Sequence, residues 1–250
     1  WKDITRKMRV VFQADGIISQ FEGFETLREF DWDGYQNKYE NIYRLDRILE
    51  AEGDSVDHYQ AAKQADTLML FYLLPVDEVA QLFQQLGYPL DQDTVQKNIT
   101  YYYRRTSHGS TLSRVVHAWI LARLNTQLSW QLYVEALESD FNDIQEGTTA
   151  EGIHTGVMAG TLDLIQRRYV GMEMRDEVVW FNPCLPEALA QGVSFRFQYR
   201  RCWFSIRATR QTVRVTFDSG RQSTAKIGIR GRIHEVEQGK TLEFSLQPEI

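Results

Sequence analysis

The sequence has little cysteine and no long apolar run. Two of its 250 residues are cysteines, Cys184 and Cys202, which is too few for a disulfide framework or a thiolate metal site. The longest mainly apolar stretch, residues 67–76, is about half the roughly 18 residues that a membrane helix needs. The segment Trp1 to Lys7 is charged and amphipathic, unlike a signal peptide. We therefore expect no membrane segment and a reducing, cytoplasmic compartment.

The sequence also lacks the basic excess of a nucleic-acid-binding protein. Its 28 Lys and Arg face 34 Asp and Glu, for a net charge of −6. Residues 1–175 carry a net charge of −9 and residues 176–250 one of +3. An acidic body is a poor partner for a phosphate backbone. The apolar fraction of 43% and charged fraction of 25% are typical of a folded globular protein and exclude general disorder.

Several common functional motifs are missing. The five histidines are scattered, and no two have His-x-x-x-His spacing, so no metal site is predicted. The sequence contains no P-loop, no dinucleotide fingerprint and no Gly-x-Ser-x-Gly elbow. We expect neither a metal nor an organic cofactor.

Apolar residues recur at helical spacing up to about residue 175. Examples are Ile42, Leu45, Ile48 and Leu49, then Leu68 to Leu74, and then Leu112, Val115, Val116, Trp119 and Ile120. Breaks such as Gly53 and Pro75 separate the segments. The pattern predicts about seven helices, and short connections between helices place neighbours side by side and antiparallel.

The period changes to two in the last part of the chain. Apolar and polar residues alternate in Val193 to Phe197 and again in Val213 to Phe217. Six or seven such strands, with turn residues between them, predict a small antiparallel β-sandwich without helices. We therefore predict two domains, a helical one over residues 1–175 and a β-sandwich over residues 176–250.

An aromatic-rich stretch, Val11 to Asp33, has neither helical nor strand period. A loop of this length inside a compact domain is usually functional or packs against another element. Its rings would suit the wall of a sugar site, since sugar faces stack on aromatic rings. They would also suit the simpler role of covering a helix end, which is the favoured interpretation.

Small hydroxyl residues open one predicted helix. Gly109 is followed by Ser110 and Thr111, just before the apolar positions of that helix. Free N–H groups at a helix start favour an anion, and two hydroxyls add donors. Ordinary N-capping would use the same residues, so the pattern alone leaves both roles open.

A second segment, residues 147–160, combines a histidine with glycines at every fourth position. Thr148 and Glu151 have capping-box spacing. The spaced glycines are Gly152, Gly156 and Gly160. A helix face that carries glycines in place of side chains is typical of a position where another group approaches the helix closely. His154 is expected in the first helical turn, where either ligand binding or a structural role would suit it.

Lys63 and Gln64 stand at the head of the most apolar predicted helix. A lysine in that place normally extends to solvent. The pair therefore indicates no function by itself.

Taken together, these three segments resemble glycoside hydrolase family 65, the maltose, trehalose and kojibiose phosphorylases and their relatives. The motifs are KQAD at residues 63–66, TSHGSTLS at 106–113, and TAEGIH at 149–154 leading into MAG at 158–160. They occur in family order, and the resemblance covers essentially the whole chain. It implies an (α/α)6 toroid, of which residues 1–175 would form the C-terminal half, followed by a C-terminal β-sandwich.

The resemblance also implies roles for particular residues. Lys63 and Gln64 would contact the sugar or phosphate. Ser110 and Thr111 would hold inorganic phosphate, with Thr111 replacing the family's usual second serine, and His154 would hydrogen-bond the anion. The implied reaction is inverting phosphorolysis of an α-linked disaccharide of maltose, trehalose or kojibiose type. Its products would be β-glucose 1-phosphate and a sugar, with inorganic phosphate as co-substrate.

The family's general acid lies well before the Lys-Gln pair, upstream of Trp1, so we assign no catalytic residue in this chain. We expect the fragment to be inactive alone. Half a toroid leaves inward helix faces uncovered, so it should pair with the missing N-terminal half or with a second copy.

Two alternatives stay open. A hydrolase of the same family would use water in place of phosphate. A non-catalytic carbohydrate-binding or assembly module would bind sugar regardless of phosphate. The Ser110, Thr111 and His154 set favours phosphate.

Overall fold

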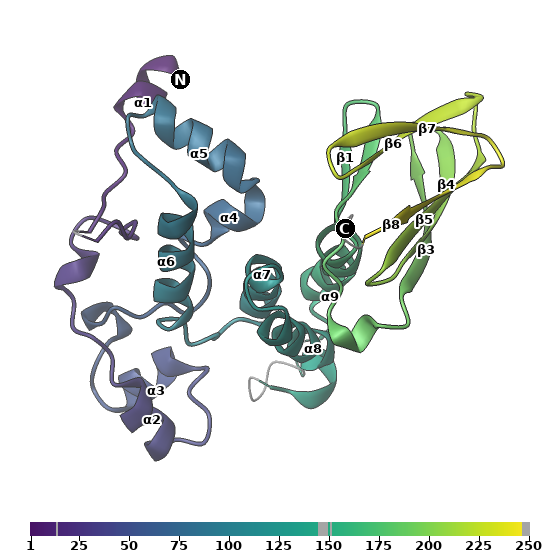
Figure 1. Ribbon diagram of the computed structural model, residues 1–250. Helices are drawn as coiled ribbons and strands as arrows, with labels where there is room; N and C mark the ends of the chain where they lie inside the picture. Colours follow the sequence, from purple (N-terminus) through teal and green to yellow (C-terminus); the bar gives the residue numbers. More distant parts are fainter. Residues whose placement is uncertain (14, 145–149, 151, 247–250) are drawn as a thin grey trace. The chain divides into compact units, whose positions relative to one another are not determined.

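The computed structural model describes residues 1–13, 15–144, 150 and 152–246, whose course Figure 1 shows. The chain forms two compact units. The helical unit comprises Trp1–Ile120 and Val134–Val157, and the sheet unit comprises Leu121–Tyr133 and Met158–Ile250. The predicted domain boundary after residue 175 remains a prediction.

The helical unit contains short helices joined by irregular segments. The helices up to residue 103 are α1 (Lys2–Lys7), α2 (Trp32–Lys38), α3 (Leu45–Ala51), α4 (Met69–Leu73), α5 (Val76–Gln85) and α6 (Gln92–Tyr103). They are followed by α7 (Thr111–Leu121), α8 (Thr126–Asn142) and α9 (Thr155–Asp163), with a π-helical turn over Leu164–Tyr169. The first part of α8, most of α9 and the π-helical turn are counted in the sheet unit. No helix within the described ranges is both long enough and apolar enough to cross a membrane.

The apolar spacing predicts the buried positions of these helices with one clear exception, Leu112 of α7, which is 43% exposed. Leu45 and Leu49 of α3 are buried, as are Val115 and Val116 of α7. Helix α4 is shorter than predicted, because Leu74 precedes a proline and adopts an extended conformation.

The aromatic-rich stretch packs onto the helical unit. The Phe24 ring is buried, with its centroid 6.1 Å from that of Tyr102 on α6. The buried amide of Asn98, also on α6, accepts a 2.8 Å hydrogen bond from the N–H of Ile18 and donates to the carbonyl oxygen of Gly16. These contacts favour the interpretation of the stretch as a cover over helices.

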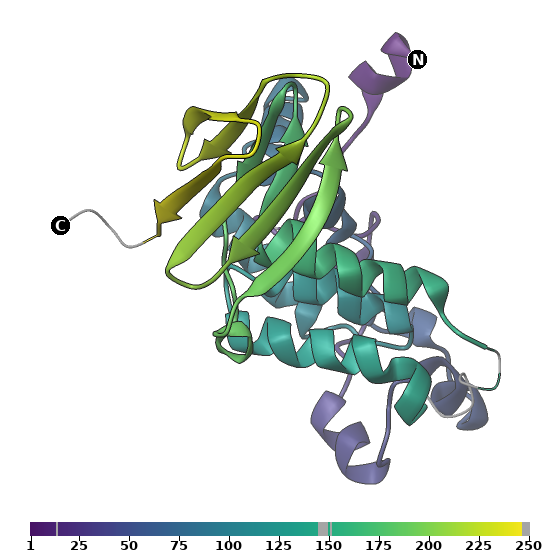
Figure 2. The same ribbon diagram turned by 90° about the vertical axis from the view of Figure 1, so that its right-hand side faces the viewer.

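The sheet unit has two four-stranded sheets, which appear as layers in Figure 2. One sheet has the order β1-β2-β6-β7, with β1 (Met172–Arg175), β2 (Val178–Phe181), β6 (Thr224–Ile229) and β7 (Arg232–Glu237). The other has the order β3-β4-β5-β8, with β3 (Val193–Tyr199), β4 (Cys202–Ala208), β5 (Thr212–Ser219) and β8 (Thr241–Ser245).

One core joins both sheets, as the alternating pattern predicts. Phe204 of β4 and Phe217 of β5 stack with ring centroids 5.2 Å apart. They belong to the same buried cluster as Phe181 and Ile227 of the other sheet. Burying alternate side chains of both sheets in this way is the usual basis of a β-sandwich.

The prediction of an antiparallel sandwich without helices needs correction at two points. Strands β2 and β6 pair in parallel, with Val179 opposite Ile227. This pairing joins strands that are far apart in sequence, and alternation alone carries no information on strand direction. A single 3-10 turn, Glu187–Leu189, also interrupts the strands.

Candidate active site region

The segment around Lys63 runs beside the segment that leads into α7. The N–H of Ala62 donates to the carbonyl oxygen of Arg105 (2.7 Å), and the N–H of Ser107 donates back to that of Ala62 (2.9 Å). The N–H of Gly109 then donates to the carbonyl oxygen of Lys63 (2.8 Å). Two of the three motif segments are therefore in direct contact, with Lys63 beside the start of α7.

Gly109 is required by this close approach. A Cβ atom at that position would lie 2.5 Å from the carbonyl oxygen of Tyr43 and 2.9 Å from Cγ of Lys63. The first contact is with backbone, which cannot rotate away. Absence of a side chain thus lets the two segments meet just before Ser110.

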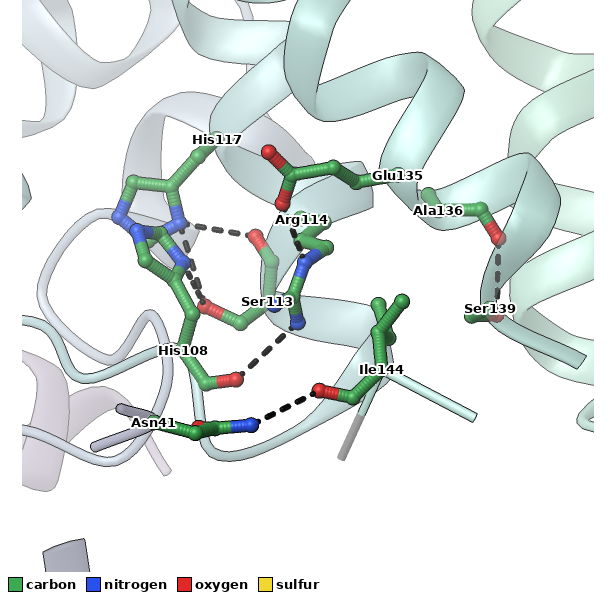
Figure 3. A network of polar contacts seen from close by, with 9 residues as sticks. All are labelled: Asn41, His108, Ser113, Arg114, His117, Glu135, Ala136, Ser139 and Ile144. Atoms are coloured by element: carbon green, nitrogen blue, oxygen red, sulfur yellow. Dashed lines mark hydrogen bonds and ion pairs between the residues drawn. The ribbon is translucent and has the colours of Figure 1, made fainter. Parts of the chain in front are cut away.

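The first turn of α7 carries a buried arginine that ties this region together (Figure 3). The Arg114 side chain is 1% exposed, and its Nε lies 2.7 Å from Oε2 of Glu135 on α8. Its Nη1 donates to the carbonyl oxygen of His108 (3.1 Å), and its guanidinium lies 4.4 Å from the ring centroid of Tyr43. Arg114 therefore links α7, α8 and the turn before Gly109.

Two buried imidazoles lie behind the same turn. His108 has a φ of 54°, and its Nδ1 is 3.0 Å from Oγ of Ser113. Nδ1 of His117 donates to the carbonyl oxygen of Ser113 (2.8 Å), one helical turn earlier. Figure 3 shows both rings converging on Ser113. The side chain of Ser113 is thus held between two histidines.

Burial keeps both histidines neutral. It lowers the pKa of His108 to about 2, and the positive charge of Arg114 and the nearby ring of His117 act in the same direction. Burial also lowers the pKa of His117 to about 4. Neither ring exchanges protons near neutral pH, so both serve as fixed hydrogen-bonding groups that hold the turn before α7.

A cavity of about 520 Å³ opens beside this region. Its lining includes Asp46, Lys63, Gln64, Asp66 and Ser107. Nζ of Lys63 lies 3.0 Å from Oδ2 of Asp46. Burial alone would raise the pKa of Asp46, but hydrogen bonds from Lys63 and Arg44 hold it below its usual value. An ammonium, an amide and carboxylates around a space of this size suit a small ligand rich in hydroxyl groups.

The predicted site residues differ in how they relate to this cavity. Lys63 and Gln64 line the cavity. From the segment that leads to α7, Ser107 also lines it. In the part of the chain that the structure describes, Ser110, Thr111 and His154 do not line this cavity. Thr111 is the first residue of α7, as predicted, and its side chain is buried.

His154 belongs to the same helical unit and is held by Asp140 of α8. Oδ2 of Asp140 accepts from the His154 N–H (2.9 Å), and Oδ1 lies 2.6 Å from Nδ1 of the ring. Helix α9 begins at Thr155, so His154 precedes the helix and does not lie in its first turn. The predicted capping pair of Thr148 and Glu151 lies outside the described residues.

The end of α8 connects His154 to the α7 start. Glu135 pairs with Arg114, and Asp140 is five residues further, which is about 7.5 Å along a helix. Nearby, the carbonyl oxygen of Ile144 lies 3.4 Å from Nδ2 of Asn41. The His154 segment is therefore connected through α8 to the start of α7, and the segment before α7 in turn contacts the Lys63 segment.

The predicted glycine stripe does not form as a single helical face. Gly152 lies before α9 with a φ of 111°, which accounts for a glycine there without any neighbour. A Cβ on Gly156 would meet nothing within 4 Å among the described residues.

Sequence reasoning missed Arg114, Glu135 and Asp140. Arg114 and Glu135 are on different helices, so only the fold brings them together. The four-residue spacing of Ser113 and His117 was a usable signal, because such residues share one helix face.

Comparison with known proteins gives the class of the protein. Residues 1–163 match the glycosyl hydrolase family 65 central catalytic domain, and residues 172–236 match the glycosyl hydrolase family 65 C-terminal domain. The chain belongs to glycosyl hydrolase family 65. The resemblance inferred from the three motifs is therefore confirmed.

Several individual proteins are similar to this chain. An uncharacterized glycosyl hydrolase of Mycobacterium tuberculosis is 49% identical over 243 residues, covering 97% of this chain and 18% of that protein. A trehalose 6-phosphate phosphorylase of Lactococcus lactis is 42% identical over 186 residues, covering 74% of this chain and 24% of that protein. A kojibiose phosphorylase of Caldanaerobacter subterraneus is 26% identical, covering 93% of this chain and 28% of that protein.

A solved structure, named "Putative kojibiose phosphorylase from human microbiome", shares the fold. It superposes with a TM-score of 0.73 at 21% identity, covering 98% of this chain and 31% of that one. The chain thus spans less than a third of each of these proteins.

Proposed function

We propose that this chain is the C-terminal portion of an inverting disaccharide phosphorylase. Family membership and the relatives named trehalose 6-phosphate phosphorylase and kojibiose phosphorylase support this. In this proposal residues 1–175 form the C-terminal half of an (α/α)6 toroid, and residues 176–250 form the C-terminal β-sandwich. The general acid belongs to the missing N-terminal half.

The observation that carries the proposal is the hydrogen bond between the Gly109 N–H and the Lys63 carbonyl oxygen (2.8 Å). It holds a lysine beside the N-terminus of an 11-residue helix whose entrance bears the hydroxyls of Ser110 and Thr111. Helix N–H groups and an ammonium both attract a phosphate dianion, and hydroxyls direct its oxygens.

Each of the five residues has a role in the proposal. Lys63 offsets the charge of the phosphate, and Gln64 hydrogen-bonds the sugar in the adjoining cavity. Ser110 and Thr111 orient the phosphate. His154 donates to it or accepts from a sugar hydroxyl.

The reaction needs one acid and one nucleophile. The acid from the N-terminal half gives its proton to the glycosidic oxygen as the bond from that oxygen to the anomeric carbon breaks. A phosphate oxygen forms the new bond from the opposite face, which inverts the configuration and gives β-glucose 1-phosphate. Because phosphate carries its own charge, no second carboxylate is needed as base.

The relatives leave the disaccharide open between trehalose, kojibiose and maltose types. The 42% identity to a protein named for trehalose 6-phosphate adds a phosphorylated disaccharide to the candidates. We also propose that the helical unit pairs with the missing half or with a second copy, in the cytoplasm. Phe141 and Ile153, 85% and 74% exposed, are side chains that such a partner would cover.

The test uses the whole natural protein with trehalose, trehalose 6-phosphate, kojibiose and maltose, each with and without inorganic phosphate. Phosphorolysis predicts that one disaccharide is cleaved only with phosphate, yielding β-glucose 1-phosphate. A Ser110→Ala/Thr111→Ala variant should raise the KM for phosphate at least tenfold, about 1.4 kcal/mol of binding free energy.

The matched control is Ser223→Ala, which removes an exposed hydroxyl from the sheet unit. It should leave the KM for phosphate unchanged. Cleavage that continues at full rate without phosphate would instead identify a hydrolase. Sugar binding without any cleavage by the whole protein would identify a binding module.

A further inference from the structure

Asp140 holds His154 at two points. One carboxylate oxygen accepts the backbone N–H of His154 (2.9 Å), and the other lies 2.6 Å from Nδ1 of its ring. The side chain of Asp140 is 9% exposed, and that of His154 is 27% exposed. One carboxylate thus holds both the main chain and the ring of a histidine whose side chain is partly exposed.

The chemistry of the pair determines the proton on the ring. The hydrogen bonds from His154 hold the pKa of Asp140 below its usual value, so the group is an ionised carboxylate at neutral pH. An ionised carboxylate only accepts hydrogen bonds, and therefore Nδ1 must carry a proton. Nε2 is then the ring nitrogen left for a ligand.

We infer that Asp140 is a positioning residue that commits Nδ1 of His154 to itself and directs Nε2 to the ligand. This inference rests on the proposed function, in which His154 meets phosphate. When the ring is neutral, Nε2 accepts from a hydroxyl. When the ring takes up a second proton, Nε2 donates to a phosphate oxygen, and the Asp140 charge balances the imidazolium.

A purely structural role of Asp140 would need only one of its two contacts with His154. Capping the start of α9 needs the bond to the backbone N–H and leaves the ring free. The 2.6 Å contact with Nδ1 is the part that a capping role does not require. The two roles therefore differ in what they predict for the ring.

The test compares Asp140→Asn with Glu138→Gln. Glu138 is two residues away on the same helix, is exposed and accepts a hydrogen bond from Nδ2 of Asn142 (3.0 Å), so it controls for loss of a charge from α8. The first readout is the ¹⁵N NMR spectrum of the His154 ring in the full chain. The inference predicts an Nδ1-protonated ring in the original protein and in Glu138→Gln, and a changed tautomer mixture in Asp140→Asn.

The second readout is the affinity for inorganic phosphate, measured by calorimetry. Asp140→Asn should weaken binding by about tenfold or more, as loss of a residue that orients a ligand-binding histidine typically does. In a double-mutant cycle, the effect of Asp140→Asn should vanish once His154 is replaced by alanine. Glu138→Gln should bind phosphate as the original protein does.

The two readouts separate this inference from the proposed function. An unchanged ring spectrum in Asp140→Asn, or an effect on phosphate that persists in His154→Ala, overturns the positioning role. If the original protein binds no phosphate while its ring responds to Asp140→Asn, the positioning of the ring stands and the proposed phosphate site in this chain fails.

Discussion

In the ion pair between Arg114 and Glu135, the guanidinium is 1% exposed while the carboxylate is 44% exposed, with Nε and Oε2 2.7 Å apart. The buried cation also donates to the carbonyl oxygen of His108, which precedes Gly109. The charge on α8 is therefore what compensates a cation buried beneath the start of α7.

Replacing Glu135 by glutamine should destabilise the protein. The change leaves the Arg114 charge buried without its ionic partner, and the half-exposed position of Glu135 reduces the cost to about 1–2 kcal/mol. Urea denaturation measures it directly. Glu138→Gln, on the exposed face of the same helix, should change the free energy of unfolding by less than about 0.5 kcal/mol.

Gly109→Ala tests the close approach of the Lys63 and α7 segments. The new Cβ would lie 2.5 Å from the carbonyl oxygen of Tyr43, so backbone must move. We expect a loss of about 1–3 kcal/mol of stability and a weaker affinity for phosphate, measured by denaturation and calorimetry.

Gly156→Ala provides the matched control for that variant. It adds the same methyl group to α9, where no atom of the residues that the structure describes lies within 4 Å of the new Cβ outside the local helix backbone. Alanine favours helix over glycine by up to about 1 kcal/mol, so this variant should be at least as stable as the original. Equal destabilisation by both substitutions would contradict the packing described at Gly109.

The buried histidines predict a pH dependence of stability. His108 and His117 have pKa values lowered to about 2 and about 4 in the folded protein, whereas an unfolded chain protonates histidine near 6.5. Below about pH 6.5 the unfolded state therefore binds more protons than the folded state, and stability falls as the pH decreases.

Urea denaturation at pH 7.5 and pH 5 checks this dependence. The free energy of unfolding should be lower at pH 5, and His117→Gln should reduce the difference between the two values. If stability is the same at both pH values, the two rings are not held neutral by burial.

Local patterns in the sequence predict the parts of the fold that depend on local periodicity. The burial of Leu45 and Leu49 follows from helical spacing, and that of Val213 and Val215 from alternation. The parallel pairing of β2 with β6 could not be predicted, because three strands of the other sheet, β3, β4 and β5, lie between them in the sequence.

The candidate site likewise has a part that local sequence patterns predict and a part that depends on contacts between distant segments. Motifs identified Lys63, Gln64 and the entrance of α7, and the structure shows why Lys63 and Gly109 adjoin. The partners Glu135 and Asp140 come from α8, whose sequence carries no functional motif. Their contacts depend on how α8 packs, which short-range spacing does not encode.

The central claim is that this chain contributes a phosphate site, and calorimetric titration with inorganic phosphate tests it most directly. The original protein and a Ser110→Ala/His154→Ala variant are compared, with circular dichroism to establish that both are folded. We predict that the original binds phosphate and that the variant does not. Equal binding by the two folded proteins, or phosphate-independent cleavage of a disaccharide by the whole natural protein, would contradict the account.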